Sequence, residues 1–325
     1  MYRFKKLTWL TAGLLLTLTA CGGGGDTVVT TTATTSVDVF DGAAIGCTVS
    51  SDGTVATEVG NGAYTFATVL DAGDVVTATG CTDADTQSLL PTLSGVPQSG
   101  AVVISPITTL IVEAAIANGV AAKGVGLRTS AKSVSTAALQ AAIAEVVANL
   151  GLGDYKPTDP ATANYVAAAK ADTTGTTPAA VVMRVSLAIS TLFKSVEVSA
   201  GPANASTAVA AVSQAIVNSL TVVDLSQSAG VAAVMTEAKA LAPAVANAIQ
   251  TASDAIVTLV TLIINTPGDI TAAIEVTTII AEFLNTADET TMTNTPAFTD
   301  LVTTTVAAAT PSCSLGTSTL GGCKL

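Results

Sequence analysis

The hydrophobic period of the sequence changes at Ser105-Pro106, and this change constrains the fold more than any other feature. Between residues 37 and 104, short β-branched runs such as AYTFATV are separated by turn dipeptides such as Asp41-Gly42 and Asn61-Gly62, which is typical of antiparallel hairpins. After Ser105, apolar residues recur every three to four positions, as in a helix that buries one face. We therefore expect an α+β protein, with a small antiparallel β-sandwich over residues 37–104 and a larger, irregular α-helical bundle over residues 105–310.

The helical part has clear start and stop signals. Ser105 is placed to cap the first helix and Pro106 to occupy its first turn, while Gly119 is placed to end it near Asn118. Residues 269–284 are apolar on nearly every side, so we expect this segment to be the central helix. Further helices are predicted over 136–150, 161–171, 178–199, 203–220, 230–254 with a break at Ala242-Pro243, 255–265, 269–285 and 298–309.

The hydrophobic core must form with very few aromatic side chains. Hydrophobic residues make up 49% of the chain but aromatic residues only 3%, so Ala, Val, Ile and Leu must fill the core. No repeat of fixed length is present, which favours an irregular bundle over a solenoid.

The N-terminus has the layout of a secretory signal. Arg3, Lys5 and Lys6 precede the apolar run from Leu7 to Leu18, which is shorter than the ~20 residues of a membrane-spanning helix. The run ends in LTAC at Cys21, and this sequence resembles the lipobox of bacterial lipoproteins. The alternative is an ordinary signal peptide that is cut near a cysteine.

The lipobox resemblance implies a lipid anchor. In such lipoproteins residues 1–20 would be removed as the signal peptide, and Cys21 would carry acyl chains such as palmitate. Gly22, at the position after the cysteine, is similar to the outer-membrane sorting pattern, which leaves either the periplasmic face or the cell surface open. Residues 21–36 would then join the lipid to the folded part, and their Gly and Thr content predicts a flexible linker.

Four cysteines remain once Cys21 is lipidated, namely Cys47, Cys81, Cys313 and Cys323. An even number in an oxidising compartment indicates two disulfides. We favour Cys47–Cys81 and Cys313–Cys323 among the three connectivities, because each pair lies within one local segment. The second pair would close residues 311–325 into a stapled C-terminal tail. A zinc site is the alternative, but the chain has no CxxC spacing and no histidine.

Two stretches resemble a known type of bacterial surface lipoprotein. VFDGAAIGCTVSSDG and GNGAYTFATVLDAGDVVTATGCTDADTQ, within residues 39–87, are similar to the carboxypeptidase-regulatory-like, or transthyretin-like, β-sandwich. The segment Ser105–Leu110, SPITTL, resembles the link from that sandwich into a helical domain, and Leu150–Ala169 resembles part of the helical half. The resemblance implies no catalytic residues, and Cys47 and Cys81 depart from the small residues usual at those positions.

Charge and composition exclude several functions. The net charge of the chain is −12. Residues 1–20 contain three of the twelve Lys and Arg residues and no Asp or Glu, so removal of the signal peptide would make the chain still more acidic. Nucleic-acid binding is therefore disfavoured. The absence of histidine excludes Ser-His-Asp and Cys-His catalysis. A serine–lysine hydrolase stays open, but no spacing singles out a pair. We therefore expect that the protein is not an enzyme, binds no cofactor and has no catalytic residues.

Two further sets of acidic residues are candidates for chemistry. Glu275 and Glu282 lie two turns apart on one predicted helix, where solvated charges are the favoured interpretation. Five aspartates of the predicted sandwich loops offer oxygen ligands for calcium as an alternative, although Asp in turns more often bonds local backbone groups. These aspartates are Asp38, Asp41, Asp52, Asp83 and Asp85.

We therefore predict a non-catalytic lipoprotein that is anchored in the outer membrane through Cys21 and acts in binding, adhesion or cell-envelope structure. Its partner would be a protein or a polysaccharide. The alternative is a self-assembling subunit of a surface layer or filament, because the mean hydropathy of +0.61 is high for a soluble monomer.

Overall fold

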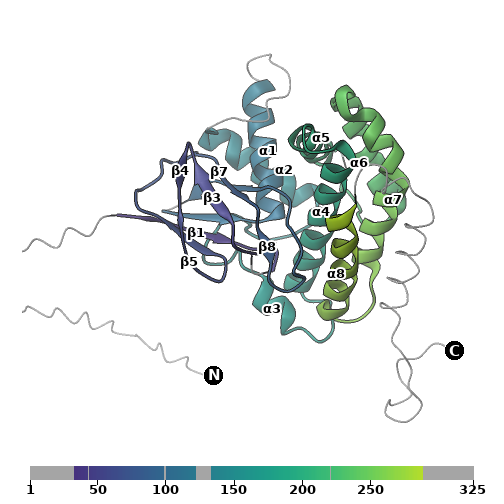
Figure 1. Cartoon of the computed structure of the whole chain (residues 1–325), viewed down its shortest axis with the longest axis horizontal. Helices are drawn as coiled ribbons and strands as arrows, with labels where there is room; N and C mark the ends of the chain where they lie inside the picture. The colour runs from purple at the N-terminus through teal and green to yellow at the C-terminus, as the bar shows by residue number, and fades with distance from the viewer. Residues whose placement is uncertain (1–32, 43, 99, 122–132, 220, 288–325) are drawn as a thin grey trace, which may run out of the picture. The chain divides into compact units, whose positions relative to one another are not determined.

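The computed structural model describes residues 33–287 except Ala43, Ser99, residues 122–132 and Leu220 (Figure 1). Several predictions therefore lie outside the described residues. They are the signal peptide, Cys21, most of the 21–36 linker, the helix at 298–309, and the tail with Cys313 and Cys323.

Strands precede helices along the chain, and the protein has the α+β composition that the sequence predicts. The strands end at Ile104 and the first helix begins at Pro106. The strands are β1 (Thr35–Val39), β2 (Ala44–Ile45), β3 (Thr48–Ser51), β4 (Thr54–Val55), β5 (Thr57–Gly60), β6 (Ala63–Phe66), β7 (Val76–Thr79), β8 (Thr82–Asp83), β9 (Leu93–Gly95), β10 (Pro97–Gln98) and β11 (Ala101–Ile104).

The strands form three sheets. A five-stranded sheet has the order β10-β11-β1-β6-β5, a four-stranded sheet the order β4-β3-β7-β9, and β2 pairs with β8. The prediction of purely antiparallel pairing is wrong in one place, because β1 and β11 are parallel, with Val37 opposite Val102. Parallel partners need a long connection, and here that connection contains all the intervening strands, so local hairpin signals do not reveal the pair.

The two larger sheets share one apolar cluster. Its largest members from the five-stranded sheet are Tyr64, Phe66 and Ile104, and Val49 and Leu93 come from the four-stranded sheet. Alternating residues point into this cluster, as in β1, where Thr35, Val37 and Val39 are buried and the two residues between them are exposed.

The helices are α1 (Pro106–Ala121), α2 (Thr136–Asn149), α3 (Val166–Lys170), α4 (Pro178–Ala200), α5 (Ala205–Val217), α6 (Ser228–Leu241), α7 (Ala246–Asn265) and α8 (Ile270–Thr286), with a 3-10 turn at Pro243–Val245. The break at Ala242-Pro243 is confirmed, but the predicted boundary after residue 254 is wrong because α7 runs on through it. Helix α1 passes the predicted stop at Gly119, and α3 is much shorter than predicted.

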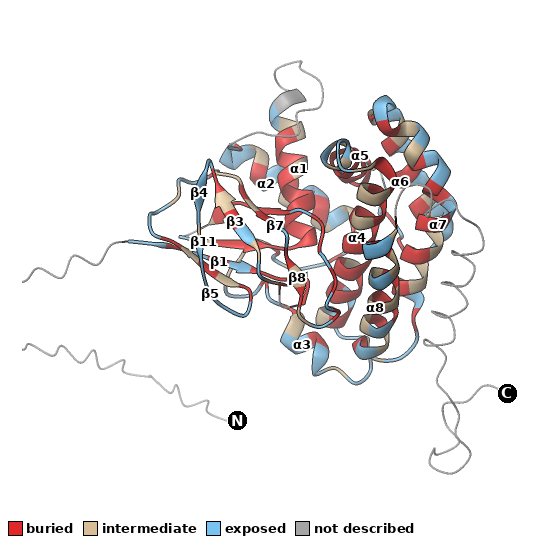
Figure 2. Cartoon of the chain, in the orientation of Figure 1, coloured by how far each residue is buried: buried red, intermediate tan, exposed pale blue. Residues whose placement is uncertain are grey.

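The central helix is α4, and the prediction that residues 269–284 hold this place is wrong. Most of α4 is buried (Figure 2), whereas α8 leaves Thr271, Glu275 and Glu282 exposed. The sequence hides this because α4 carries many small hydroxyl residues. One of them, Ser199, satisfies its hydroxyl within the helix by donating to the carbonyl of Ser195 at 2.7 Å, so this polar residue is buried at low cost.

Hydrogen bonds join α1 to the four-stranded sheet. The backbone N–H of Thr108 donates to the Ser105 hydroxyl at 3.2 Å, which confirms Ser105 as the cap. The Thr108 hydroxyl donates to the carbonyl of Ser94 on β9 at 2.8 Å, and the Ser94 N–H donates to the Thr109 hydroxyl at 2.9 Å. The SPITTL segment therefore fixes the start of α1 against β9.

By length and composition alone, α4 and the Pro243–Asn265 segment are apolar enough to cross a membrane. A buried core helix such as α4 has the same length and apolar composition, so these two features do not by themselves indicate a membrane span.

Candidate ligand-binding cavity

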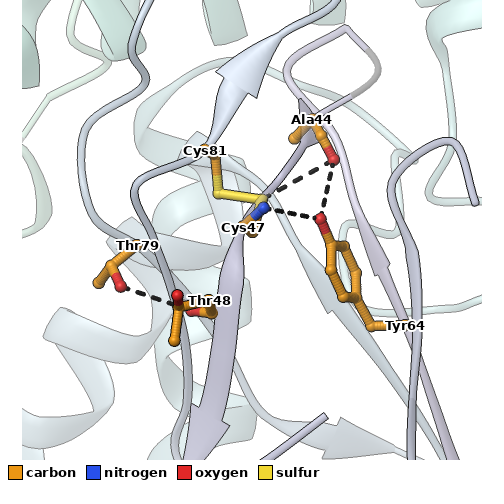
Figure 3. Close-up of a disulfide and its surroundings, with 6 residues drawn as sticks. All are labelled: Ala44, Cys47, Thr48, Tyr64, Thr79 and Cys81. Atoms are coloured by element: carbon orange, nitrogen blue, oxygen red, sulfur yellow. Dashed lines mark hydrogen bonds between the residues drawn. A yellow bond between two sulfur atoms is a disulfide. The ribbon is translucent and has the colours of Figure 1, made fainter. Parts of the chain in front are cut away.

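Cys47 and Cys81 form a disulfide, as the sequence predicts (Figure 3). Cys47 directly precedes β3 and Cys81 closely follows β7, and the two strands pair so that Thr48 lies opposite Thr79. The bond therefore clamps one end of this strand pair. Tyr64 supports it from β6, since its hydroxyl accepts a hydrogen bond from the Cys47 N–H at 3.0 Å and donates to the Ala44 carbonyl at 3.4 Å.

A cavity of about 440 Å³ lies between the four-stranded sheet and helices α1, α4 and α5. Ser50, Thr77 and Ser94 line its sheet side. The strand registers place Ser50 opposite Thr77 and Thr77 opposite Ser94, so these residues form a row of hydroxyls across β3, β7 and β9. The Ser50 and Thr77 hydroxyls are 3.4 Å apart.

One face of α1 forms the opposite wall. Thr109, Val112, Glu113 and Ile116 all line the cavity, and their spacing places them on one side of a helix. Glu113 is the only charged residue between Ile107 and Ala117, and its neighbours Val112 and Ala114 are buried. The sequence therefore places a carboxylate on a helix that is otherwise buried.

Glu197 lines the same cavity from α4. Its Oε1 accepts a hydrogen bond from the Thr92 N–H at 3.3 Å, and its other carboxylate oxygen lies 4.0 Å from Lys194 Nζ. Burial raises the pKa of Glu197, while Lys194 and the Thr92 N–H oppose that rise. The Glu197 carboxylate thus has partners within the protein.

Among the described residues, none compensates Glu113 in this way. Burial raises the pKa of its carboxyl group to about 7, and no hydrogen bond or ion pair joins its side chain to any other residue in the described part of the chain. Removal of a carboxylate from water without a partner is costly and favours the protonated form.

A second pair of buried carboxylates lies where β1 and β8 meet α4, and we call Asp41 and Asp83 the acidic joint. The Ser186 hydroxyl of α4 donates to Asp41 Oδ1 at 3.3 Å. Burial and the neighbouring Asp83 charge raise the pKa of Asp41 to about 7. Burial raises the pKa of Asp83 to about 6, opposed by backbone N–H groups of Asp85 and Thr86.

The acidic joint is tightly filled. The void beside Asp41 and Asp83 is only about 20 Å³, which is room for roughly one water molecule. Gly42 has a φ of +107°, and a Cβ atom there would lie 2.7 Å from Asp83 Oδ1. On the exposed side, Lys170 of α3 pairs with Asp85 at 2.5 Å.

The five aspartates considered for calcium do not gather at one point. Asp83 lies near Asp41 and Asp85, whereas Asp52 lines the cavity and Asp38 is exposed on β1. The described residues hold no cluster of three or more acidic, cysteine or histidine side chains suited to a metal ion. Glu275 and Glu282 both lie exposed on α8.

A larger groove, of about 660 Å³, lies beside the start of α4. Leu152, Tyr155, Val181 and Val182 give it a mainly apolar lining. It has no buried carboxylate, so it offers less chemical specificity than the Glu113 cavity.

The chain was compared with models of protein families, with curated proteins and with solved structures, and it matches none of them. The resemblance of residues 39–110 to transthyretin-like surface lipoproteins therefore stays a prediction.

Proposed function

We propose that this chain is a lipid-anchored, non-catalytic binding protein of the cell envelope. The observation that carries the binding role is the cavity of about 440 Å³, in which two half-buried glutamates face a row of hydroxyls. This size is within the range of small-molecule sites, and buried groups of raised pKa are common in them. The cavity lining includes no histidine, lysine or arginine among the described residues, which favours binding over turnover.

The fold also supports a β-sandwich and a helical bundle with the candidate site between them. The shared apolar cluster of the two larger sheets supports a small sandwich, and the packing of the helices around α4 supports a bundle. The cavity lies between the two parts, and sites between structural parts are a common place for ligands.

The anchoring proposal depends on Cys21. We expect Cys21→Ser to prevent incorporation of radiolabelled palmitate and to release the protein from the membrane fraction. Gly22→Asp is the matched variant, since it should keep the label but move the protein from the outer to the inner membrane fraction. A Cys21→Ser protein that stays in the membrane fraction would contradict the lipid anchor.

The alternative, a self-assembling surface subunit, has one supporting observation. Strand β5 is an edge of the five-stranded sheet, and all its residues are exposed, with Val59 66% exposed. A free strand edge is able to pair with another copy. Glu58 in the middle of this strand opposes such pairing. Size-exclusion chromatography with light scattering separates the two proposals, because a monomer at high concentration would exclude assembly.

A further inference from the structure

We propose that the Glu113 cavity binds a small aliphatic amine in its ammonium form, with Glu113 as the anchoring carboxylate and the hydroxyl row as additional acceptors. This inference rests on the proposed binding function and assigns a ligand class to it.

The first argument is charge. Asp52, Glu113 and Glu197 line the cavity, and no basic side chain lines it among the described residues. Lys194 approaches Glu197 to 4.0 Å, so Glu197 is partly neutralised, whereas Glu113 has no partner in the described part of the chain. A ligand cation would supply the positive charge that no described residue provides for Glu113.

The second argument is hydrogen bonding. An ammonium group has three donors and no acceptor, and carboxylate and hydroxyl oxygens are acceptors. Glu113, Ser50, Thr77 and Thr109 provide such oxygens in one cavity. A neutral or anionic ligand would leave the negative charge of the ionised Glu113 carboxylate uncompensated, which favours the amine.

The third argument separates amine types. The described residues of the lining include no aromatic side chain, and aromatic rings are what proteins use to hold quaternary ammonium ions. Val75, Val112, Ile116 and Val209 instead offer aliphatic surface. A short alkyl chain with a terminal –NH₃⁺ therefore fits the lining better than a trimethylammonium group does.

Binding should depend on pH through Glu113. The pKa of this carboxyl group is about 7 because of burial, and a bound cation favours its ionised form. Within the described ranges, the other charged groups at the cavity are Asp52 and Glu197, the latter with Lys194. Amine binding should therefore release a proton and become tighter as the pH rises from 6 to 8.

The test is calorimetric titration of the full-length chain in nonionic detergent. The probes are 1-aminopentane, 1,5-diaminopentane, pentyltrimethylammonium, 1-pentanol and hexanoate. We expect at least one of the two primary amines to bind and the other three probes to give no saturable heat. Glu113→Gln should weaken amine binding by about tenfold or more, the usual loss for a hydrogen bond to a charged group.

Two variants control this test. Glu275→Gln removes an exposed carboxylate on α8 and should leave the affinity unchanged. Ala205→Leu places a larger side chain in the cavity lining and should abolish binding while the melting temperature changes little. Glu113→Gln should fold, because it removes a charge whose burial is unfavourable.

The outcomes separate the two proposals. Saturable binding of 1-pentanol or hexanoate that Ala205→Leu abolishes, without amine binding, would overturn the amine assignment and keep the cavity as a ligand site. No binding of any probe would overturn both the amine assignment and the cavity as the carrier of the proposed function. Amine binding that survives Glu113→Gln would overturn the anchoring role of Glu113.

Discussion

The Glu113 cavity and the acidic joint each contain a carboxyl group whose pKa is raised to about 7. Burial is the main cause in both, and at Asp41 the neighbouring Asp83 charge adds to it. They differ in space and in partners. The joint has a void of about 20 Å³ and its Asp41 accepts a hydrogen bond from Ser186, whereas Glu113 faces a cavity of about 440 Å³ without a partner in the described part of the chain.

Space and partners, rather than the pKa, distinguish a binding carboxylate from a structural one. A raised pKa alone identifies only burial. At Asp41 the protein supplies hydroxyl donors and leaves no room for a ligand, so the group joins the strands to α4. At Glu113 the fold leaves space, and no described residue donates a hydrogen bond to the carboxylate. Four predictions test this contrast.

The largest expected effect is the dependence of stability on pH. An acid whose pKa is higher in the folded state than its ordinary value, 3.8 for Asp41, holds more protons when folded. Stability is therefore highest at low pH and is lost as the pH rises toward 7. We expect Asp41 and Glu113 together to lower the free energy of unfolding by about 4 kcal/mol between pH 5 and 8, as measured by urea unfolding.

Single variants assign this effect to the two regions. Asp41→Asn and Glu113→Gln should each flatten the pH profile, whereas Asp254→Asn, at an exposed position on α7, should not. Only Glu113→Gln should also change amine binding. A protein that is more stable at pH 8 than at pH 5 would show that these carboxyl groups are not buried as described.

The second effect is loss of the disulfide. The bond spans 34 residues, and removing a crosslink of that length costs about 3–4 kcal/mol in the chain-entropy account. Cys47→Ser combined with Cys81→Ser should lower the free energy of unfolding by this amount. Because Cys81 lies directly before β8, hydrogen exchange should accelerate more at β8 and Asp83 than at α1. Equal acceleration in both regions would contradict the separation of the joint from the cavity wall.

The smallest effect concerns the packing of the joint. Gly42→Ala places a Cβ atom against Asp83 at a positive φ, whereas Gly46→Ala at φ +67° meets nothing within 4 Å. We expect Gly42→Ala to lower the free energy of unfolding by about 2–3 kcal/mol and Gly46→Ala by about 1 kcal/mol. Equal losses of unfolding free energy for the two variants, measured by thermal unfolding, would show that the acidic joint accommodates a Cβ atom at residue 42.

Local signals in the sequence predicted a large part of the fold. Ser105 caps α1, as its position before Pro106 predicts. The same capping chemistry is found at Thr177, which caps α4 through the Ala180 N–H, and at Asp269, which caps α8. The Cys47–Cys81 disulfide followed from proximity in the chain. The parallel β1–β11 pair and the central place of α4 did not follow, because both depend on contacts between distant segments.

The cavity was not predictable as a site, although one signal for it is present. Its lining comes from three strands and three helices. Tertiary packing brings these elements together, and local sequence signals do not reveal it. The isolated Glu113 in the apolar run Ile107–Ala117 was the available clue, since a charge on a buried helix face needs a reason. Glu275 and Glu282 are also spaced along one face of a helix, but both are exposed, so their charges need no such reason.

The contrast between the two regions is tested most directly by NMR titration of the side-chain carboxyl carbons, with and without 1,5-diaminopentane. The Glu113 and Asp41 signals are assigned by their loss in Glu113→Gln and Asp41→Asn. The account predicts that the amine lowers the pKa of Glu113 and leaves the pKa of Asp41 unchanged. An unchanged pKa for Glu113 in the presence of the amine, or an equal fall for both groups, would contradict it.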